Sequence, residues 1–219
     1  MRNEKIKKIA FAGILIALIV VMTFTNLGFI ILPSSVSITL VHIPVLIGAM
    51  VLGKKYGALL GFVFGFCSFI LSFFNISTNA PFTNPLVSIL PRILFGFLVV
   101  PIYNLFYKLI KNDIASSLIT MIVSSFLHTI IVLTMIFIVW KTGFYFGVDE
   151  FVANCGTLEG TTLFKYIYAV LISNGLIEMG LAGVVGTPII KAIKVIASKN
   201  QVKDDVQVIE ENDEHPQEK

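Results

Sequence analysis

The chain has 219 residues, of which 56% are hydrophobic and only 13% are charged. A soluble domain carries about 25% charged residues, so this composition excludes an ordinary soluble protein and favours one embedded in a membrane. The net charge of +3 does not indicate nucleic-acid binding, because the basic residues lie at the ends of apolar segments and not in one stripe.

Six apolar segments predict six membrane-spanning helices, and therefore an all-α membrane bundle. In chain order they cover about 6–27, 41–52, 56–74, 85–110, 114–140 and 161–197. The second segment is short for a crossing helix, so either flanking residues extend it or other helices shield it. The third carries Gly57, Gly61 and Gly65 at four-residue spacing, which favours close packing inside the bundle. The fourth contains Pro91 and Pro101.

The distribution of basic residues predicts the topology. Positive residues concentrate on the cytoplasmic side of a membrane, so we expect both termini in the cytoplasm. Residues 1–197 would form the membrane domain, and the polar segment 198–219 has too little apolar surface to fold alone and is expected to be a disordered cytoplasmic tail. Thirteen of the sixteen Lys and Arg residues lie on the side assigned to the cytoplasm: Arg2, Lys5, Lys7, Lys8, Lys54, Lys55, Lys108, Lys111, Lys191, Lys194, Lys199, Lys203 and Lys219.

The basic N-terminus followed by an apolar run also has the form of a secretory signal peptide. The run is too long for one, and 23–30 offers no cleavage site of small residues. We therefore expect a retained first helix.

Arg92 is a cation within the fourth predicted span. Its charge would be satisfied by an ion pair with Glu178, or it would anchor an anionic group, which a guanidinium grips with a planar fork. We favour the anchor, because charges inside a membrane usually mark ligand pathways.

Asn174 and Glu178 are four residues apart, so they share one face of the sixth span and must point into the bundle or a water-filled cavity. Such groups either join helices or bind a ligand. His42, at the start of the second span, and His128, within the fifth, are each more often structural than ligand-binding residues. Further candidates for the lining of a site are Asn84, Ser88, Ser124, Ser125, Phe82, Phe95 and Tyr168.

Motifs for covalent chemistry are missing from the sequence. The segment 48–55 approaches a phosphate-binding loop, but Lys55 replaces the required hydroxyl residue and the intervening residues are apolar. Glu178 is the only carboxylate clearly within a span, whereas hydrolysis needs paired carboxylates, a metal cluster or a nucleophile with a base. We expect a protein that is not an enzyme, with no catalytic residues, no metal and no cofactor.

Small residues form a stripe on the first span. Gly13 and Ala17 are four residues apart, with Ala10 one turn earlier, and such a stripe lets another helix approach closely. That helix belongs either to the same bundle or to a separate protein.

The chain resembles the substrate-binding S-component of energy-coupling factor (ECF) vitamin transporters. The resemblance covers about 6–197 and is strongest over 37–100. Besides six spans with both ends inside, it is carried by TLVHIPVLIG at 39–48, LGKKYG at 52–57, GFVFG at 61–65 and PRILFG at 91–96.

This resemblance implies a six-helix subunit that captures a vitamin near the outer face, beneath the outer loops 28–40 and 75–84. It implies as partners a separate membrane subunit and two ATPases. The family's docking mark is Ala-x-x-x-Ala on the first helix, and here Gly13 and Ala17 occupy its positions. The segment around Arg92 most resembles the pantothenate-type group, and the carboxylate of pantothenate would suit Arg92.

We therefore expect a high-affinity vitamin-binding subunit of an ECF-type ABC importer in the plasma membrane. The alternatives are an S-component for another vitamin, such as riboflavin or a thiamine precursor, a cell-envelope scaffold, and a secondary transporter working alone. The predicted substrate-binding residues are Arg92, Asn174, Glu178, His128, Asn84, Ser88 and Phe95.

Overall fold

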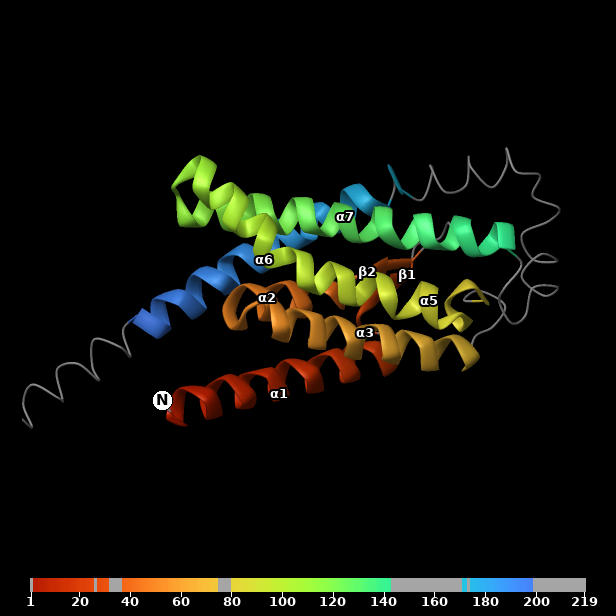
Figure 1. Ribbon diagram of the computed structural model, residues 1–219, viewed down its shortest axis with the longest axis horizontal. Coiled ribbons are helices and arrows are strands. Elements are labelled where there is room, and N and C mark those ends of the chain that lie inside the picture. The colour runs from red at the N-terminus through yellow and green to blue at the C-terminus, as the bar shows by residue number, and fades with distance from the viewer. Residues whose placement is uncertain are drawn as a thin grey trace, which may run out of the picture.

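The computed structural model describes residues 2–25, 27–31, 37–74, 80–142, 171–172 and 174–198. They form a bundle of elongated helices with a small two-stranded sheet near the middle of its length (Figure 1). The helices are α1 (Arg2–Phe24), α2 (His42–Leu52), α3 (Lys54–Phe74), the 3-10 turn η1 (Ala80–Thr83), α5 (Pro85–Ser88), α6 (Leu90–Ile110), α7 (Asp113–Thr142) and a final helix, Asn174–Ser198, whose segment η2 (Ala182–Gly186) is π-helical.

Five of these helical segments are long and apolar enough to cross a membrane: Lys5–Phe24, Lys54–Phe74, Pro85–Ile110, Asp113–Val139 and Asn174–Ser198. With the shorter apolar helix α2, the described part of the chain contains the six bundle helices that the sequence predicts. The expected start of the sixth span, at 161–170, and the predicted tail beyond Ser198 lie outside the described residues.

A short hairpin departs from the all-α expectation. Strand β1 (Phe29–Ile31) pairs antiparallel with β2 (Ser37–Thr39), and Ile30 lies opposite Ile38. Both strands contain β-branched residues, which favour extended structure. Three-residue strands are too short to produce a recognisable alternation in the sequence.

Helix α2 is short because its neighbours shield it. All residues from His42 to Ala49 are buried, so the helix does not have to match the thickness of a bilayer by itself. It ends at Leu52, and the following Gly53 has a φ of 98°, which suits glycine and turns the chain directly into α3. Of the two explanations predicted for the short second span, shielding is confirmed.

The glycine stripe of α3 brings its backbone against α6. A Cβ atom added to Gly61 would lie 2.0 Å from the carbonyl oxygen of Arg92, and one added to Gly57 would lie 2.3 Å from that of Gly96. The predicted role of these glycines in internal packing is thereby confirmed. The close contact also fixes the backbone of α6 at Arg92.

The fourth predicted span is interrupted near its start. Helix α5 ends at Ser88, Ile89 forms a turn, and α6 begins at Leu90, with Pro91 in its first turn. Proline has no N–H to donate to the preceding turn, and this explains the break. Pro101 lies inside α6 without ending it.

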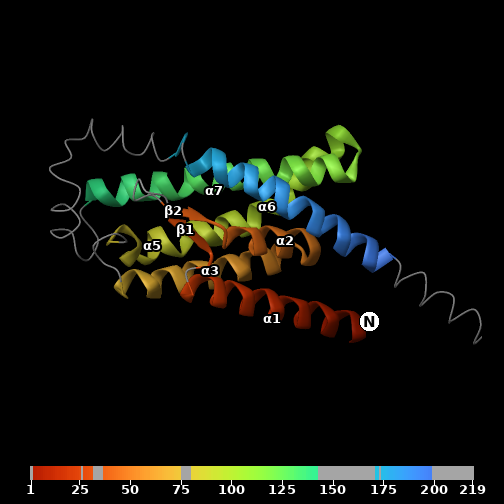
Figure 2. The same ribbon diagram turned by 180° about the vertical axis from the view of Figure 1, so that it is seen from behind.

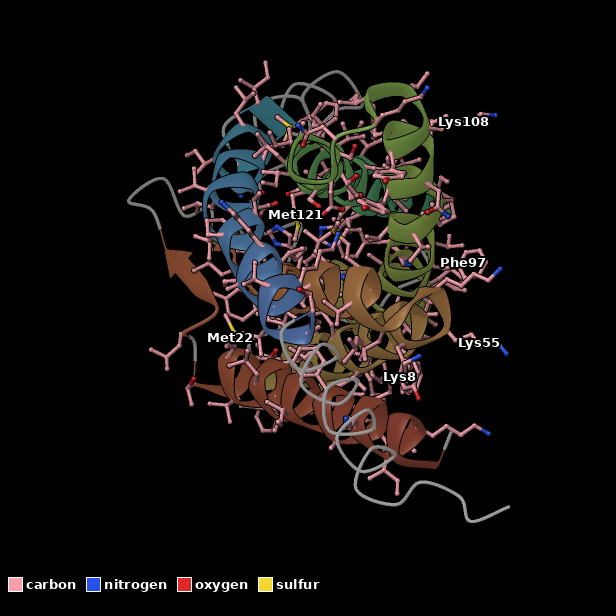
Figure 3. The ribbon with its side chains drawn as sticks, turned by 90° about the vertical axis from the view of Figure 1, so that its left-hand side faces the viewer. Lys8, Met22, Lys55, Phe97, Lys108 and Met121 are labelled. Atoms are coloured by element: carbon pink, nitrogen blue, oxygen red, sulfur yellow. The ribbon has the colours of Figure 1, made fainter. Side chains whose placement is uncertain are left out.

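Basic residues gather at one end of the bundle. The start of α1, the α2–α3 turn, the α6–α7 turn and the end of the final helix all lie at the left of Figure 1. Viewed from that end, Lys55 and Lys108 lie at the periphery, whereas Met121 lies between the helices (Figure 3). The one-sided arrangement of charge predicted from the sequence is therefore present in three dimensions.

A polar cluster joins three helices at this same end. Lys194 Nζ, on the final helix, lies 2.5 Å from Asp113 Oδ1 at the start of α7. The Tyr103 hydroxyl of α6 donates to the same carboxylate oxygen. Ion pairs with exposed members stabilise a protein by at most about 1 kcal/mol, so this cluster mainly fixes the relative positions of the three helices.

Candidate ligand-binding site

Four ionisable side chains from four different helices converge inside the bundle. They are His42 of α2, Arg92 of α6, His128 of α7 and Glu178 of the final helix, and each is at most 5% exposed. The Glu178 carboxylate interacts electrostatically with both Arg92 and His42. Arg92 and His42 in turn interact with His128. We call these four residues the polar core.

The Arg92 guanidinium is held by a carbonyl group and by aromatic rings. Its Nη1 donates to the Val87 carbonyl oxygen at 2.6 Å. Its central carbon lies 4.9 Å from the ring centroid of Phe82 and 5.5 Å from that of Phe64, within the range of cation–π attraction. Nε has no hydrogen-bond partner within the described part of the chain.

Arg92 and Glu178 do not form the ion pair that the sequence offered as one alternative. Among the described residues, no carboxylate oxygen lies within 4.0 Å of the Arg92 guanidinium. Glu178 instead accepts from the backbone N–H of Thr39 at 2.7 Å and from the Thr129 hydroxyl at 3.1 Å. Its carboxylate thereby joins β2, α7 and the final helix, and the charge of Arg92 is left without a direct counterion in this part of the structure.

The two histidines stack in the middle of the polar core. The rings of His42 and His128 lie 5.8 Å apart at an angle of 15°. Nε2 of His42 is hydrogen-bonded to the Ser125 hydroxyl at 3.1 Å. The His128 ring also contacts Phe95 at 4.8 Å and Phe64 at 6.0 Å. The predicted candidates His128 and Phe95 therefore lie together.

Several donors and acceptors in this region have no partner among the described residues. They include both ring nitrogens of His128 and the Ser124 hydroxyl, in addition to Nε of Arg92. A buried polar group without a hydrogen bond costs about 1–3 kcal/mol, so a concentration of such groups requires an explanation. Together they provide the polar groups with which a small ligand could be recognised.

The remaining predicted residues have mixed surroundings. Asn174 is buried one turn before Glu178, as their spacing predicts. Asn84 accepts from the backbone N–H of Leu86 at 2.8 Å and caps α5. Ser88 donates to the Gly65 carbonyl oxygen at 3.0 Å and joins α5 to α3. These last two bonds support the segment that precedes Arg92. Tyr168, predicted as a wall residue, lies outside the described residues.

His42 and Ser125 belong to this region although neither was among the predicted substrate-binding residues. His42 was considered in the sequence, but a lone histidine at the start of a short span gives no indication of which helix it faces. Ser125 lies 83 positions away along the chain. Their contact depends on the packing of α2 against α7, for which the sequence has no local signal.

The small-residue stripe of α1 faces away from the bundle. Gly13 and Ala17 are exposed, as is Ala10. A Cβ atom added to Gly13 would meet no other atom within 4 Å. The helix buries Ala12, Leu15 and Ile19 instead, and it lies at the edge of the bundle in both side views (Figures 1 and 2). Packing inside the described bundle is therefore excluded as the reason for the stripe.

Among the described residues, including the polar core, no group of three or more His, Cys, Asp or Glu side chains could hold a metal ion. The polar core contains one carboxylate and one guanidinium, and its groups suit noncovalent recognition of a polar molecule.

Comparison with known proteins agrees with this geometry. Residues 7–190 match the family model described as the ECF transporter, substrate-specific component. The chain is also 29% identical, over 209 residues, to the pantothenic acid transporter PanT of Lactococcus lactis subsp. cremoris (strain MG1363), a match that covers 88% of this chain and 96% of that protein. The chain therefore belongs to the family of ECF transporter substrate-specific components, and it is a multi-pass membrane transport protein and not an enzyme.

Proposed function

We propose that this chain captures pantothenate from outside the cell as the substrate-binding subunit of an ECF-type ABC importer. The observation that carries the proposal is the buried Arg92 guanidinium, which has an unpartnered Nε and no carboxylate within 4.0 Å in the described part of the chain. A ligand carboxylate would supply both the opposite charge and a bidentate acceptor. The similarity to a pantothenic acid transporter supports this choice of vitamin.

The other polar groups of the region suit the rest of such a ligand. Pantothenate carries a secondary amide in its middle and two hydroxyl groups at the end opposite its carboxylate. The ring nitrogens of His128, together with Asn174 and Glu178, would hydrogen-bond to these groups. Phe95 and Phe64, which contact the His128 ring, would cover the apolar surface of the ligand. A few placed polar groups on an apolar lining are typical of small-molecule sites.

The orientation follows from the charged end of the bundle. Positive residues favour the cytoplasmic side, so the end that holds Lys8, Lys55 and Lys108 would face the cytoplasm, together with both termini. Arg92 lies near the start of α6 and Glu178 near the start of the final helix. Both helices run toward the basic end, so these residues would lie nearer the outside, beneath the β1–β2 hairpin.

The exposed stripe of α1 would serve the transport step. Gly13, Ala17 and Ala10 leave a face that a helix of the ECF coupling subunit can approach closely. Two ATPases bound to that subunit would supply the energy, because no residue of this chain is expected to hydrolyse ATP. The vitamin would be released inside after the partner complex reorients this subunit.

Calorimetry on the purified protein tests the proposal with a matched pair of ligands. Panthenol replaces the carboxylate of pantothenate with a hydroxymethyl group and keeps the remainder of the molecule. Because a hydrogen bond to a charged group contributes about 1.5–3 kcal/mol, we expect pantothenate to bind about 10- to 100-fold more tightly. Arg92→Gln should remove most of this preference.

A screen against riboflavin, thiamine precursors, folate and biotin gives the opposing outcome. If one of these vitamins binds with nanomolar affinity and pantothenate does not bind, that vitamin is the substrate instead of pantothenate. Equal affinity for pantothenate and panthenol would remove Arg92 as the anchor of the carboxylate.

A further inference from the structure

The acceptor of the Arg92 side chain is a carbonyl group that a proline leaves available. In an α-helix the N–H of residue 91 would donate to the carbonyl of residue 87, four positions earlier. Pro91 has no N–H and cannot make this bond. Arg92 Nη1 donates to that same Val87 oxygen at 2.6 Å. The Arg92 side chain thus binds the carbonyl oxygen to which Pro91 cannot donate.

Other contacts limit how far the guanidinium can move. The rings of Phe82 and Phe64 lie 4.9 and 5.5 Å from its central carbon. The Arg92 carbonyl is pressed against Gly61 of α3, where even a methyl group would not fit. With the backbone fixed and Nη1 bound to Val87, the edge formed by Nε and Nη2 is left as the pair of donors for a bidentate acceptor.

We infer that Pro91 is a positioning residue for ligand recognition. By keeping the Val87 carbonyl available, it fixes the rotamer in which Arg92 presents its Nε–Nη2 edge to the carboxylate of the ligand. This inference rests on the proposed function for the identity of the ligand. The hydrogen bond from Arg92 to Val87 does not depend on it.

A single substitution separates positioning from structural support. Pro91→Ala restores an N–H that competes with Arg92 for the Val87 oxygen. Pro91 is buried in the first turn of α6, so the melting temperature of the variant is measured beside that of the wild type to show that both are folded. If Pro91 only shaped the helix, the affinities for pantothenate and panthenol would change by the same factor. If it positions Arg92, pantothenate should lose about tenfold in affinity and panthenol less than about twofold.

Pro101→Ala is the matched control, because Pro101 lies within the same helix with an exposed side chain. It should change neither affinity nor the ratio between them. Pro91→Ser also restores the N–H and replaces the alanine variant if that variant does not fold.

The outcomes distinguish this inference from the proposed function. An unchanged ratio of affinities in Pro91→Ala, with a normal ratio in the wild type, overturns the positioning role and leaves the function intact. If the wild type does not discriminate between the two ligands, a crystal structure of Pro91→Ala decides. Nη1 still bonded to Val87 would overturn the inference, and Nη1 displaced from it would support the positioning role alone.

Discussion

The backbone N–H of Thr39 donates to Oε1 of Glu178 at 2.7 Å, across 139 positions of the chain. The bond joins the end of the β1–β2 hairpin to the final helix. The second carboxylate oxygen accepts from Thr129 of α7 at 3.1 Å. One buried carboxylate therefore fixes the hairpin over the polar core.

Replacing Glu178 tests this structural role. Glu178→Gln keeps the shape but replaces a charged acceptor with a neutral amide. The bond from Thr39 N–H therefore becomes weaker, and the contact with the Thr129 hydroxyl must reverse its direction or be lost. We expect the protein to lose about 1–3 kcal/mol of stability, measured as a lower melting temperature of the purified protein. Thr129→Val removes only the hydroxyl partner and should cost less. An unchanged melting temperature in Glu178→Gln would contradict the assigned role.

Gly61 tests the close approach of α3 and α6. In Gly61→Ala the new methyl group would meet the Arg92 carbonyl oxygen at 2.0 Å, so the helices must separate or shift. Overpacking of this kind costs about 1–3 kcal/mol, and a shifted Arg92 should also weaken vitamin binding. Both are measured on the same sample, by thermal unfolding and calorimetry.

Gly180→Ala is the matched control, because a Cβ atom there meets nothing within 4 Å. Alanine has the higher helix propensity, so this variant should be at least as stable as the wild type. Equal stability of the two alanine variants would show that α3 and α6 do not depend on the glycine for their separation.

The variant His128→Phe tests whether the unpartnered ring nitrogens of His128 bind the ligand. His128→Phe keeps an aromatic ring against Phe95 but removes both nitrogens, which have no hydrogen-bond partner among the described residues. Stability should therefore be unchanged or higher. Vitamin affinity should fall about tenfold. His42→Phe provides the contrast, since it also removes the bond to Ser125 and should lower stability. Unaltered vitamin binding in His128→Phe would exclude His128 from the site.

The sequence predicted those features that depend on local composition. The apolar runs indicated the bundle helices, including the bounds of Pro85–Ile110. The spacing of Gly57, Gly61 and Gly65 indicated a close helix contact, and the Asn174–Glu178 spacing indicated a shared buried face. Each of these signals lies within one helix, where the helical period relates the position of a residue in the sequence to the face of the helix on which it lies.

Features that depend on contacts between distant segments were not predictable in this way. The stacking of His42 on His128 and the Thr39–Glu178 bond both require the packed bundle. The Arg92–Glu178 ion pair, which the sequence left open as the alternative to a ligand anchor, is not formed among the described residues. The two side chains interact electrostatically without direct contact. Glu178 instead accepts hydrogen bonds from the backbone N–H of Thr39 and the hydroxyl group of Thr129.

Gly13 tests the proposed docking face of α1. A leucine there would project from the exposed stripe into the space that a partner helix would occupy, and its Cβ atom would meet no atom of its own bundle within 4 Å. In cells that contain the ECF module, Gly13→Leu should abolish most uptake of labelled pantothenate, whereas vitamin binding to the purified variant should be unchanged. Gly180→Leu places the same side chain on another exposed glycine and should retain uptake. Because the two variants add equal apolar surface, a difference between them locates the coupling contact on α1. Full uptake by Gly13→Leu would show that the partner binds elsewhere.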